Sequence, residues 1–111
     1  MKNKFANAGK GILAGMRHKS ILAQMIFGIC ALIAGVFLQL AYLEWCVVVL
    51  CIGCVIASEM LNTCIEKLCD MYSLEYLTDI KIIKDIAAGA VFFAAMTAIV
   101  IGLIIYVPIF F

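Results

Sequence analysis

Three long apolar stretches dominate the chain. Residues 21–43 form a run of 23 residues without a charge, and residues 86–111 form a second such run of 26. At about 1.5 Å per helical residue, each is long enough to cross a hydrocarbon core of roughly 30 Å. The middle stretch begins beside Trp45 and stays uncharged only to Ser58, before Glu59. The pattern predicts three membrane-spanning helices.

The middle helix is expected to continue beyond Glu59. No Gly or Pro follows to end it, and apolar residues recur at helical spacing as far as Asp70. The predicted spans are therefore residues 21–43, 44–70 and 85–108. Asp85 suits the start of the third helix because a carboxylate is favourable at the positive N-terminal end.

A further helix is predicted before the first span, within residues 1–19. Apolar residues recur at helical spacing on one side, and basic and amide residues occupy the others. Such a helix lies on a membrane surface, where its bases favour anionic lipid headgroups. A solvated polar face explains the charges equally well.

Composition and charge support one membrane domain over residues 1–111. The chain is 68% hydrophobic with a net charge of +1, so it has more apolar surface than a soluble domain of this size can bury, and nothing suggests a nucleic-acid partner. All eight Lys and Arg lie in two clusters, at residues 2–19 and 67–84. The positive-inside rule then places the N-terminus in the cytoplasm and the C-terminus outside.

Small residues recur every fourth position on the third predicted span, from Ala90 to Gly102. The pairs Ala31 with Gly35, and Gly53 with Ala57, repeat this spacing on the other spans. Such positions allow close helix contacts. Because three helices are few for enclosing several carboxylates, we expect these seams also to join copies in a homo-oligomer.

One face of the middle helix carries four polar side chains within an arc of roughly 80°. They are Glu59, Asn62, Glu66 and Asp70. Ionisable groups within a membrane are costly and usually mark a site. Lys84 and Asp85 are their expected neighbours. Interhelical salt bridges that only hold the bundle together, or a proton or cation pathway, are the alternatives.

The stripe has the hard oxygen ligands that Mg²⁺ prefers, and this ion commonly arrives with nucleotide phosphates. Lys84 is placed to neutralise phosphate charge. Glu59, higher in the membrane, is placed to take a proton from an alcohol whose tails remain in lipid. The chain has no GxxxxGK[ST] loop, so any phosphoryl transfer must be built from helices.

Two segments resemble the small bacterial diacylglycerol kinase and undecaprenol kinase family. They are EMLNTCIEKLCD at 59–70, with E-x-x-N-[ST]-x-I-E-x-x-x-D spacing, and KDIAAGAV at 84–91. The resemblance covers most of the chain. It implies a homotrimer of three-span subunits in the bacterial cytoplasmic membrane, each with a surface helix, that transfers phosphate from ATP to a lipid alcohol.

The resemblance also implies roles for individual residues. Glu59 would be the general base, and Glu66 a ligand of the Mg²⁺ that accompanies ATP. The remaining members of the ATP and phosphate site would be Asn62, Asp70, Glu75, Lys84 and Asp85.

Two positions depart from the family pattern. Lys19 stands where the family usually has a metal-binding Glu, and Leu77 replaces a histidine that follows Glu75. These changes motivate an alternative, a catalytically impaired member that binds lipid or a partner protein. The Asn62-Thr63 form of the motif favours undecaprenol over diacylglycerol as the substrate.

Overall fold

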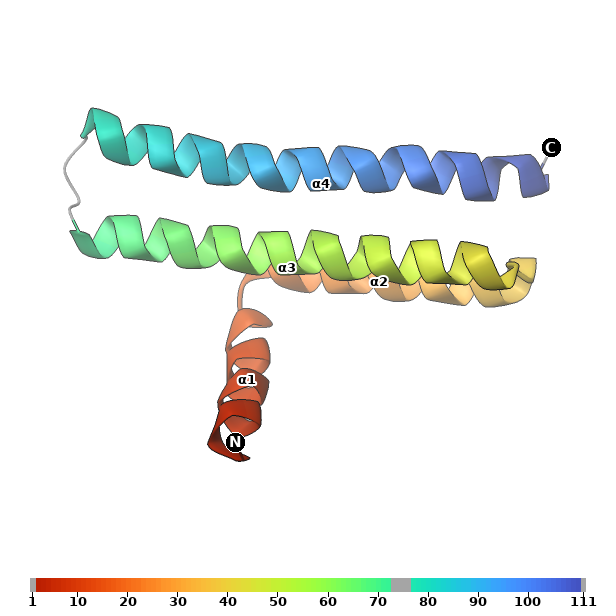
Figure 1. The fold of residues 1–111 in the computed structure, drawn as a ribbon, viewed down its shortest axis with the longest axis horizontal. Coiled ribbons are helices and arrows are strands. Elements are labelled where there is room, and N and C mark those ends of the chain that lie inside the picture. The colour runs from red at the N-terminus through yellow and green to blue at the C-terminus, as the bar shows by residue number, and fades with distance from the viewer. Residues whose placement is uncertain (1, 73–76, 111) are drawn as a thin grey trace.

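The computed structural model describes residues 2–72 and 77–110, which form four helices and no strand (Figure 1). The helices are α1 (Lys2–Gly15), α2 (Lys19–Leu38), α3 (Tyr42–Tyr72) and α4 (Thr78–Phe110). Three of them, α2, α3 and α4, are long and apolar enough to cross a membrane. They run side by side, whereas α1 leaves the bundle at a steep angle. The predicted all-α membrane fold, with an N-terminal helix ahead of three spans, is confirmed.

A tight turn joins α2 to α3. Gln39 adopts the left-handed conformation, with φ of 55°, and its N–H donates to the carbonyl of Val36. The N–H of Leu40 donates to the carbonyl of Gly35 at 3.3 Å, which completes a Schellman motif. Glu44 then caps α3, because its carboxylate accepts the N–H of Ala41 at 2.8 Å. The first two spans are therefore held antiparallel by local hydrogen bonds.

The helix α3 packs against both α2 and α4. Two glycines of α2 let it approach α3 closely. A Cβ atom at Gly28 would lie 2.7 Å from Cγ2 of Ile52, and one at Gly35 would lie 2.9 Å from the ring of Trp45. Between these two glycines, the carbonyl of Ala31 accepts a hydrogen bond from the hydroxyl of Tyr106 at 2.8 Å, which connects α4 to α2. Close contact between small and large side chains holds α2 on α3.

Some predicted boundaries and contacts differ from those of the structure. The first span ends at Leu38 and not at 43, and α4 begins at Thr78, seven residues before the predicted 85. Hydropathy marks the part of a helix in lipid, whereas α4 continues beyond it through polar residues. Asp79 in its first turn and an ion pair between Lys81 and Asp85 favour this extension.

Only some of the close contacts predicted at small residues form within one protomer. Gly35 lies in a close helix contact, as predicted. A Cβ atom at Gly53 or Gly102 would instead have nothing within 4 Å. Regular spacing identifies a face that permits close approach, but it does not say which helix approaches it.

Candidate functional site

Glu59, Asn62, Glu66 and Asp70 lie on one face of α3 and form what we call the stripe. It extends from the buried part of the bundle to the polar end of the bundle, which we define as residues 66–72 and 78–85. Glu59 and Asn62 are buried, with 8% and 9% of their surface exposed, whereas Glu66 and Asp70 are exposed. The same helix face therefore presents one carboxylate inside the protein and two towards solvent.

Asn62 and Glu66 are joined across one turn of α3. The Asn62 Nδ2 amide donates to Oε1 of Glu66 at 3.1 Å. The Asn62 Oδ1 atom is buried without a hydrogen-bond partner among the described residues. A buried, unpaired acceptor is costly, so a further hydrogen-bond donor beside Asn62 Oδ1 would be favourable.

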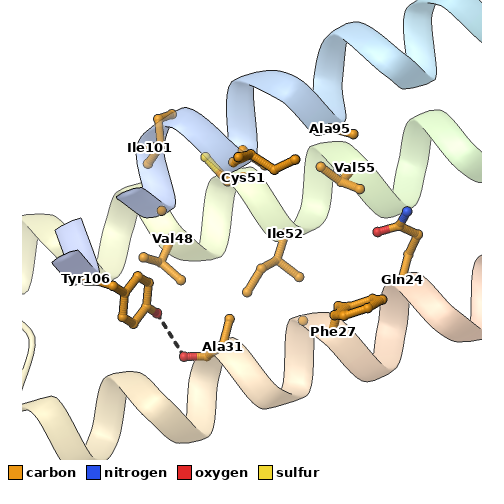
Figure 2. A pocket seen from close by; sticks show the side chains of 14 residues that line it. Gln24, Phe27, Ala31, Val48, Cys51, Ile52, Val55, Ala95, Ile101 and Tyr106 are labelled. Atoms are coloured by element: carbon orange, nitrogen blue, oxygen red, sulfur yellow. Dashed lines mark hydrogen bonds between the residues drawn. The ribbon is translucent and has the colours of Figure 1, made fainter. Parts of the chain in front are cut away.

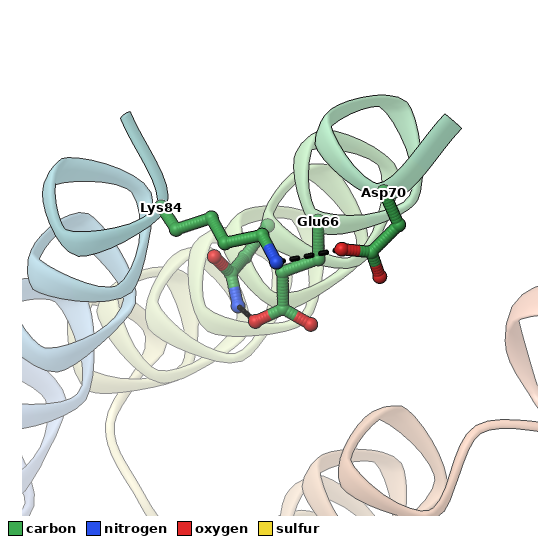
Figure 3. Close-up of polar contacts among 4 residues, drawn as sticks. Glu66, Asp70 and Lys84 are labelled. Atoms are coloured by element: carbon green, nitrogen blue, oxygen red, sulfur yellow. Dashed lines mark hydrogen bonds and ion pairs between the residues drawn. The ribbon is translucent and has the colours of Figure 1, made fainter. Parts of the chain in front are cut away.

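The best-defined contact between α3 and α4 at the polar end is an ion pair (Figure 3). The Lys84 ammonium lies 2.6 Å from Oδ1 of Asp70. The two side chains are 37% and 54% exposed, so water screens the pair and it adds little to stability. Lys84 is held beside the stripe, yet little free energy opposes its transfer to another anion.

The other predicted site residues make no described contact with the stripe of α3. Asp85 turns to its own helix, where it pairs with Lys81 at 2.5 Å. Lys19 is exposed at the first position of α2, and Leu77 is exposed and accepts the first backbone hydrogen bond of α4. Glu75 lies outside the described residues. The structure therefore brings together Asn62 with Glu66 and Lys84 with Asp70.

Thr63, the second residue of the Asn-Thr pair in the motif, is satisfied within its own helix. Its hydroxyl donates to the carbonyl of Glu59 at 3.0 Å. By contrast, the Glu59 carboxylate makes no hydrogen bond or ion pair within the part of the chain that the structure describes. Within the described residues, the Glu59 carboxylate is therefore not engaged by another side chain.

The depth of the site follows from the position of α1. The C-terminal end of this helix lies against α3, where a Cβ atom at Gly15 would be 3.4 Å from the Met60 side chain. From Tyr42 to Met60 the helix α3 rises about 27 Å, close to the thickness of a hydrocarbon core. Glu59 therefore stands at the level of α1, while Asp70 stands about 15 Å further out.

The residues at the polar end are compatible with a magnesium ion that arrives with a nucleotide. No group of three or more His, Cys, Asp or Glu side chains gathers into a metal site among the described residues. Magnesium is, however, often held by one or two carboxylates, with phosphates and water completing its shell. Glu66 is exposed and shares only Oε1 with Asn62, so it fits that role.

An apolar cavity of about 380 Å³ lies between α2, α3 and α4 (Figure 2). Gln24 and Tyr106 contribute polar groups, and the rest of the lining is aliphatic or aromatic apart from Cys51. Val55 lines the cavity and precedes Glu59 by one helical turn. This cavity could not be predicted from the sequence, because its walls come from three helices and its residues are ordinary for membrane spans.

The fold and site together define a small three-span membrane protein with a polar, phosphate-compatible site at one end of the bundle. Residues 6–106 match the family model for prokaryotic diacylglycerol kinase. The chain is also 36% identical over 105 residues to undecaprenol kinase from Bacillus subtilis (strain 168), covering 94% of this chain and 85% of the relative. No solved structure matches it. The chain belongs to the prokaryotic diacylglycerol kinase family, and hence to the membrane lipid kinases.

Proposed function

We propose that the protein transfers the terminal phosphate of ATP to the hydroxyl of a membrane lipid, at the cytoplasmic surface of the membrane. The observation that carries this proposal is the depth of the stripe. Glu59 lies level with the surface helix α1, and Glu66, Asp70 and Lys84 stand on its water side. A lipid alcohol and a soluble nucleotide meet at such a boundary.

Glu59 would act as the general base. Its carboxylate is buried and pairs with no other described residue, so it is available to accept the proton of the lipid hydroxyl as the oxygen attacks the γ-phosphorus of ATP. The bond between the γ-phosphorus and the bridging oxygen breaks, and ADP leaves with the electron pair. Asn62, one turn away, offers its unpaired Oδ1 as an acceptor for a substrate hydroxyl or amino group.

Lys84 would bind the phosphates. Its ammonium is held by Asp70 at the polar end in a screened ion pair, so a more highly charged triphosphate competes for it effectively. Glu66, oriented by Asn62, would hold the Mg²⁺ that accompanies ATP. When bound, that ion neutralises charge on the phosphates. Asp85 and Glu75 remain candidates for the outer part of the nucleotide site.

The apolar cavity would take the hydrocarbon tail of the substrate. Its wall reaches Val55, so a chain that fills it ends within one helical turn of Glu59. The homologous protein of Bacillus subtilis is an undecaprenol kinase, and the Asn62-Thr63 motif points the same way. We therefore propose undecaprenol as the lipid alcohol, ahead of diacylglycerol.

The test is phosphate transfer by the purified protein in mixed micelles with labelled ATP and either lipid. Thin-layer separation should show labelled undecaprenyl phosphate and less labelled phosphatidate. Labelling of phosphatidate alone would overturn the choice of lipid. Labelling of neither, with no heat of MgATP binding by calorimetry, would instead support the impaired member that Lys19 and Leu77 motivate.

A further inference from the structure

The apolar cavity contains a side-chain amide without a partner among the described residues. Gln24 of α2 lines the cavity, and Figure 2 shows its side chain extending towards α3 beside Val55. Its amide makes no hydrogen bond within the described parts of the chain. Tyr106 also lines the cavity, but its hydroxyl donates to the carbonyl of Ala31 at 2.8 Å. Gln24 therefore brings donor hydrogens and an acceptor oxygen into the cavity unpaired.

Gln24 occupies a position where an unpaired amide is costly. It lies within the uncharged run 21–43 and is half-buried. In hydrocarbon no water replaces the hydrogen bonds that an amide loses, so polar side chains at membrane depth usually face a partner or a pathway. Because Gln24 extends into the cavity, a molecule that fills the cavity is the expected source of that partner.

The depth of Gln24 follows from the packing of α2 on α3. The helix α2 approaches α3 closely at Gly28, opposite Ile52, and again at Gly35, opposite Trp45. Seven residues forward along α2 therefore correspond to seven residues backward along α3. The two antiparallel helices keep this register between the contacts, and it assigns the level of the neighbouring turn.

The register places Gln24 slightly less than one helical turn from Glu59 in depth. Gln24 precedes Gly28 by four residues, so it lies level with Ile56, three residues or about 4.5 Å along α3 from Glu59. Val55, the cavity residue beside Gln24, shares a helix face with Glu59 because four residues separate them. The free amide and the buried carboxylate therefore belong to one region between two packed helices.

We propose that Gln24 binds the hydroxyl of the lipid alcohol and holds it towards Glu59. The inference rests on the proposed function, in which the tail of the alcohol fills the cavity. An amide N–H of Gln24 donates to one lone pair of the hydroxyl oxygen. The hydroxyl hydrogen is left for Glu59, and the second lone pair is left for the attack on phosphorus. A glutamine orients the attacking oxygen in a comparable way in some GTPases.

Solid-state magnetic resonance on the full chain in vesicles tests this contact without relying on turnover. The chain has two glutamines, Gln24 and Gln39, so ¹⁵N in the glutamine side chains labels two sites. Gln39, in the turn after α2, is an internal control. The probe is undecaprenol enriched in ¹³C at the carbon that bears the hydroxyl. Dipolar dephasing by this carbon is expected for the nitrogen of Gln24 and not for that of Gln39.

Kinetics test the role of the contact. Gln24→Met removes the amide and keeps an unbranched side chain of similar length. The kcat for undecaprenol should fall about tenfold, because the hydroxyl loses one hydrogen bond, while the KM for MgATP stays unchanged. Gln39→Asn keeps an amide at a left-handed position that Asn tolerates, and it should leave both values unchanged.

The outcomes separate this inference from the proposed function. No dephasing at Gln24, or equal dephasing at the two glutamines, would overturn the contact even if the same sample phosphorylates undecaprenol. Dephasing confined to Gln24 in a sample that phosphorylates no lipid would support the contact and overturn the kinase proposal. An unchanged kcat in Gln24→Met would remove Gln24 from the orientation of the hydroxyl.

Discussion

Burial separates side chains that look alike in the sequence. Glu59 and Glu66 occupy the same helix face. The first is buried and has no partner among the described residues, whereas the second is exposed and accepts a hydrogen bond from Asn62. The first environment suits a proton acceptor, and the second suits a ligand for a hydrated cation. The stripe was predictable from spacing, because four polar residues in lipid require an explanation. Its division into two environments was not predictable, because it depends on how α3 packs against α2 and α4.

Lys84 supplies a test of phosphate binding. In Lys84→Gln the KM for MgATP should rise about tenfold or more, because a charge-assisted contact to phosphate is lost. Initial rates of lipid phosphorylation at varied MgATP would measure it. The control Lys67→Gln removes an exposed base of α3, which lies outside the arc of the stripe, and should leave KM near the parent value. An unchanged KM in Lys84→Gln would remove Lys84 from the nucleotide site.

The family resemblance implies that Lys19 stands in place of an acidic metal ligand, where its charge would repel a cation held by Glu66. Lys19→Glu should therefore lower the Mg²⁺ concentration that gives half-maximal activity at fixed ATP. Arg17→Glu reverses a nearby exposed charge and controls for general effects. A higher Mg²⁺ requirement in Lys19→Glu would indicate instead that Lys19 contacts phosphate.

At the scale of elements, the helices were predictable and their contacts were not. Long uncharged runs imply spans, but polar residues such as Asp79 and Lys81, which lie outside the predicted spans, form the first turn of α4. Gly28, which makes the tightest approach to α3, had no small partner at the predicted spacing. Its contact requires knowing that Ile52 faces it.

Gly28→Ala tests the packing of α2 on α3. The added methyl group would lie 2.7 Å from Ile52, whose branched side chain has little freedom in a helix, so we expect about 1–3 kcal/mol of destabilisation. Unfolding in detergent micelles would measure it. Gly11→Ala in α1, where the new methyl group meets nothing within 4 Å, should be neutral or stabilising by up to about 1 kcal/mol. Ile52→Ala added to Gly28→Ala should recover part of the loss, and a stable Gly28→Ala would contradict the close contact.

Some helix faces of the whole molecule have no neighbouring helix within one protomer. Gly53 on α3 and Gly89 on α4 both have open space where a side chain would extend. These positions allow a second copy to approach closely, which fits the homo-oligomer predicted from small-residue spacing. The number of copies is implied only by the family resemblance, because seams on single helices do not fix the angle between subunits.

Native mass spectrometry of the protein released from detergent tests the homotrimer. Three copies are expected as the main species. Gly53→Leu should reduce the trimer by placing a bulky side chain in the seam, whereas Leu50→Ile on the same helix, at a position 67% exposed in the protomer, should preserve it. A monomer that retains phosphotransfer activity would contradict this prediction.

The central claim is that Glu59 removes the proton of a lipid hydroxyl at the membrane boundary. Its most direct test is the rate of phosphate transfer from labelled ATP to undecaprenol by the parent protein and by Glu59→Gln. Gln keeps the size of the side chain but is a far weaker base, so kcat should fall roughly 10²–10⁴-fold while MgATP binding by calorimetry stays unchanged. Undiminished turnover in Glu59→Gln would contradict the account.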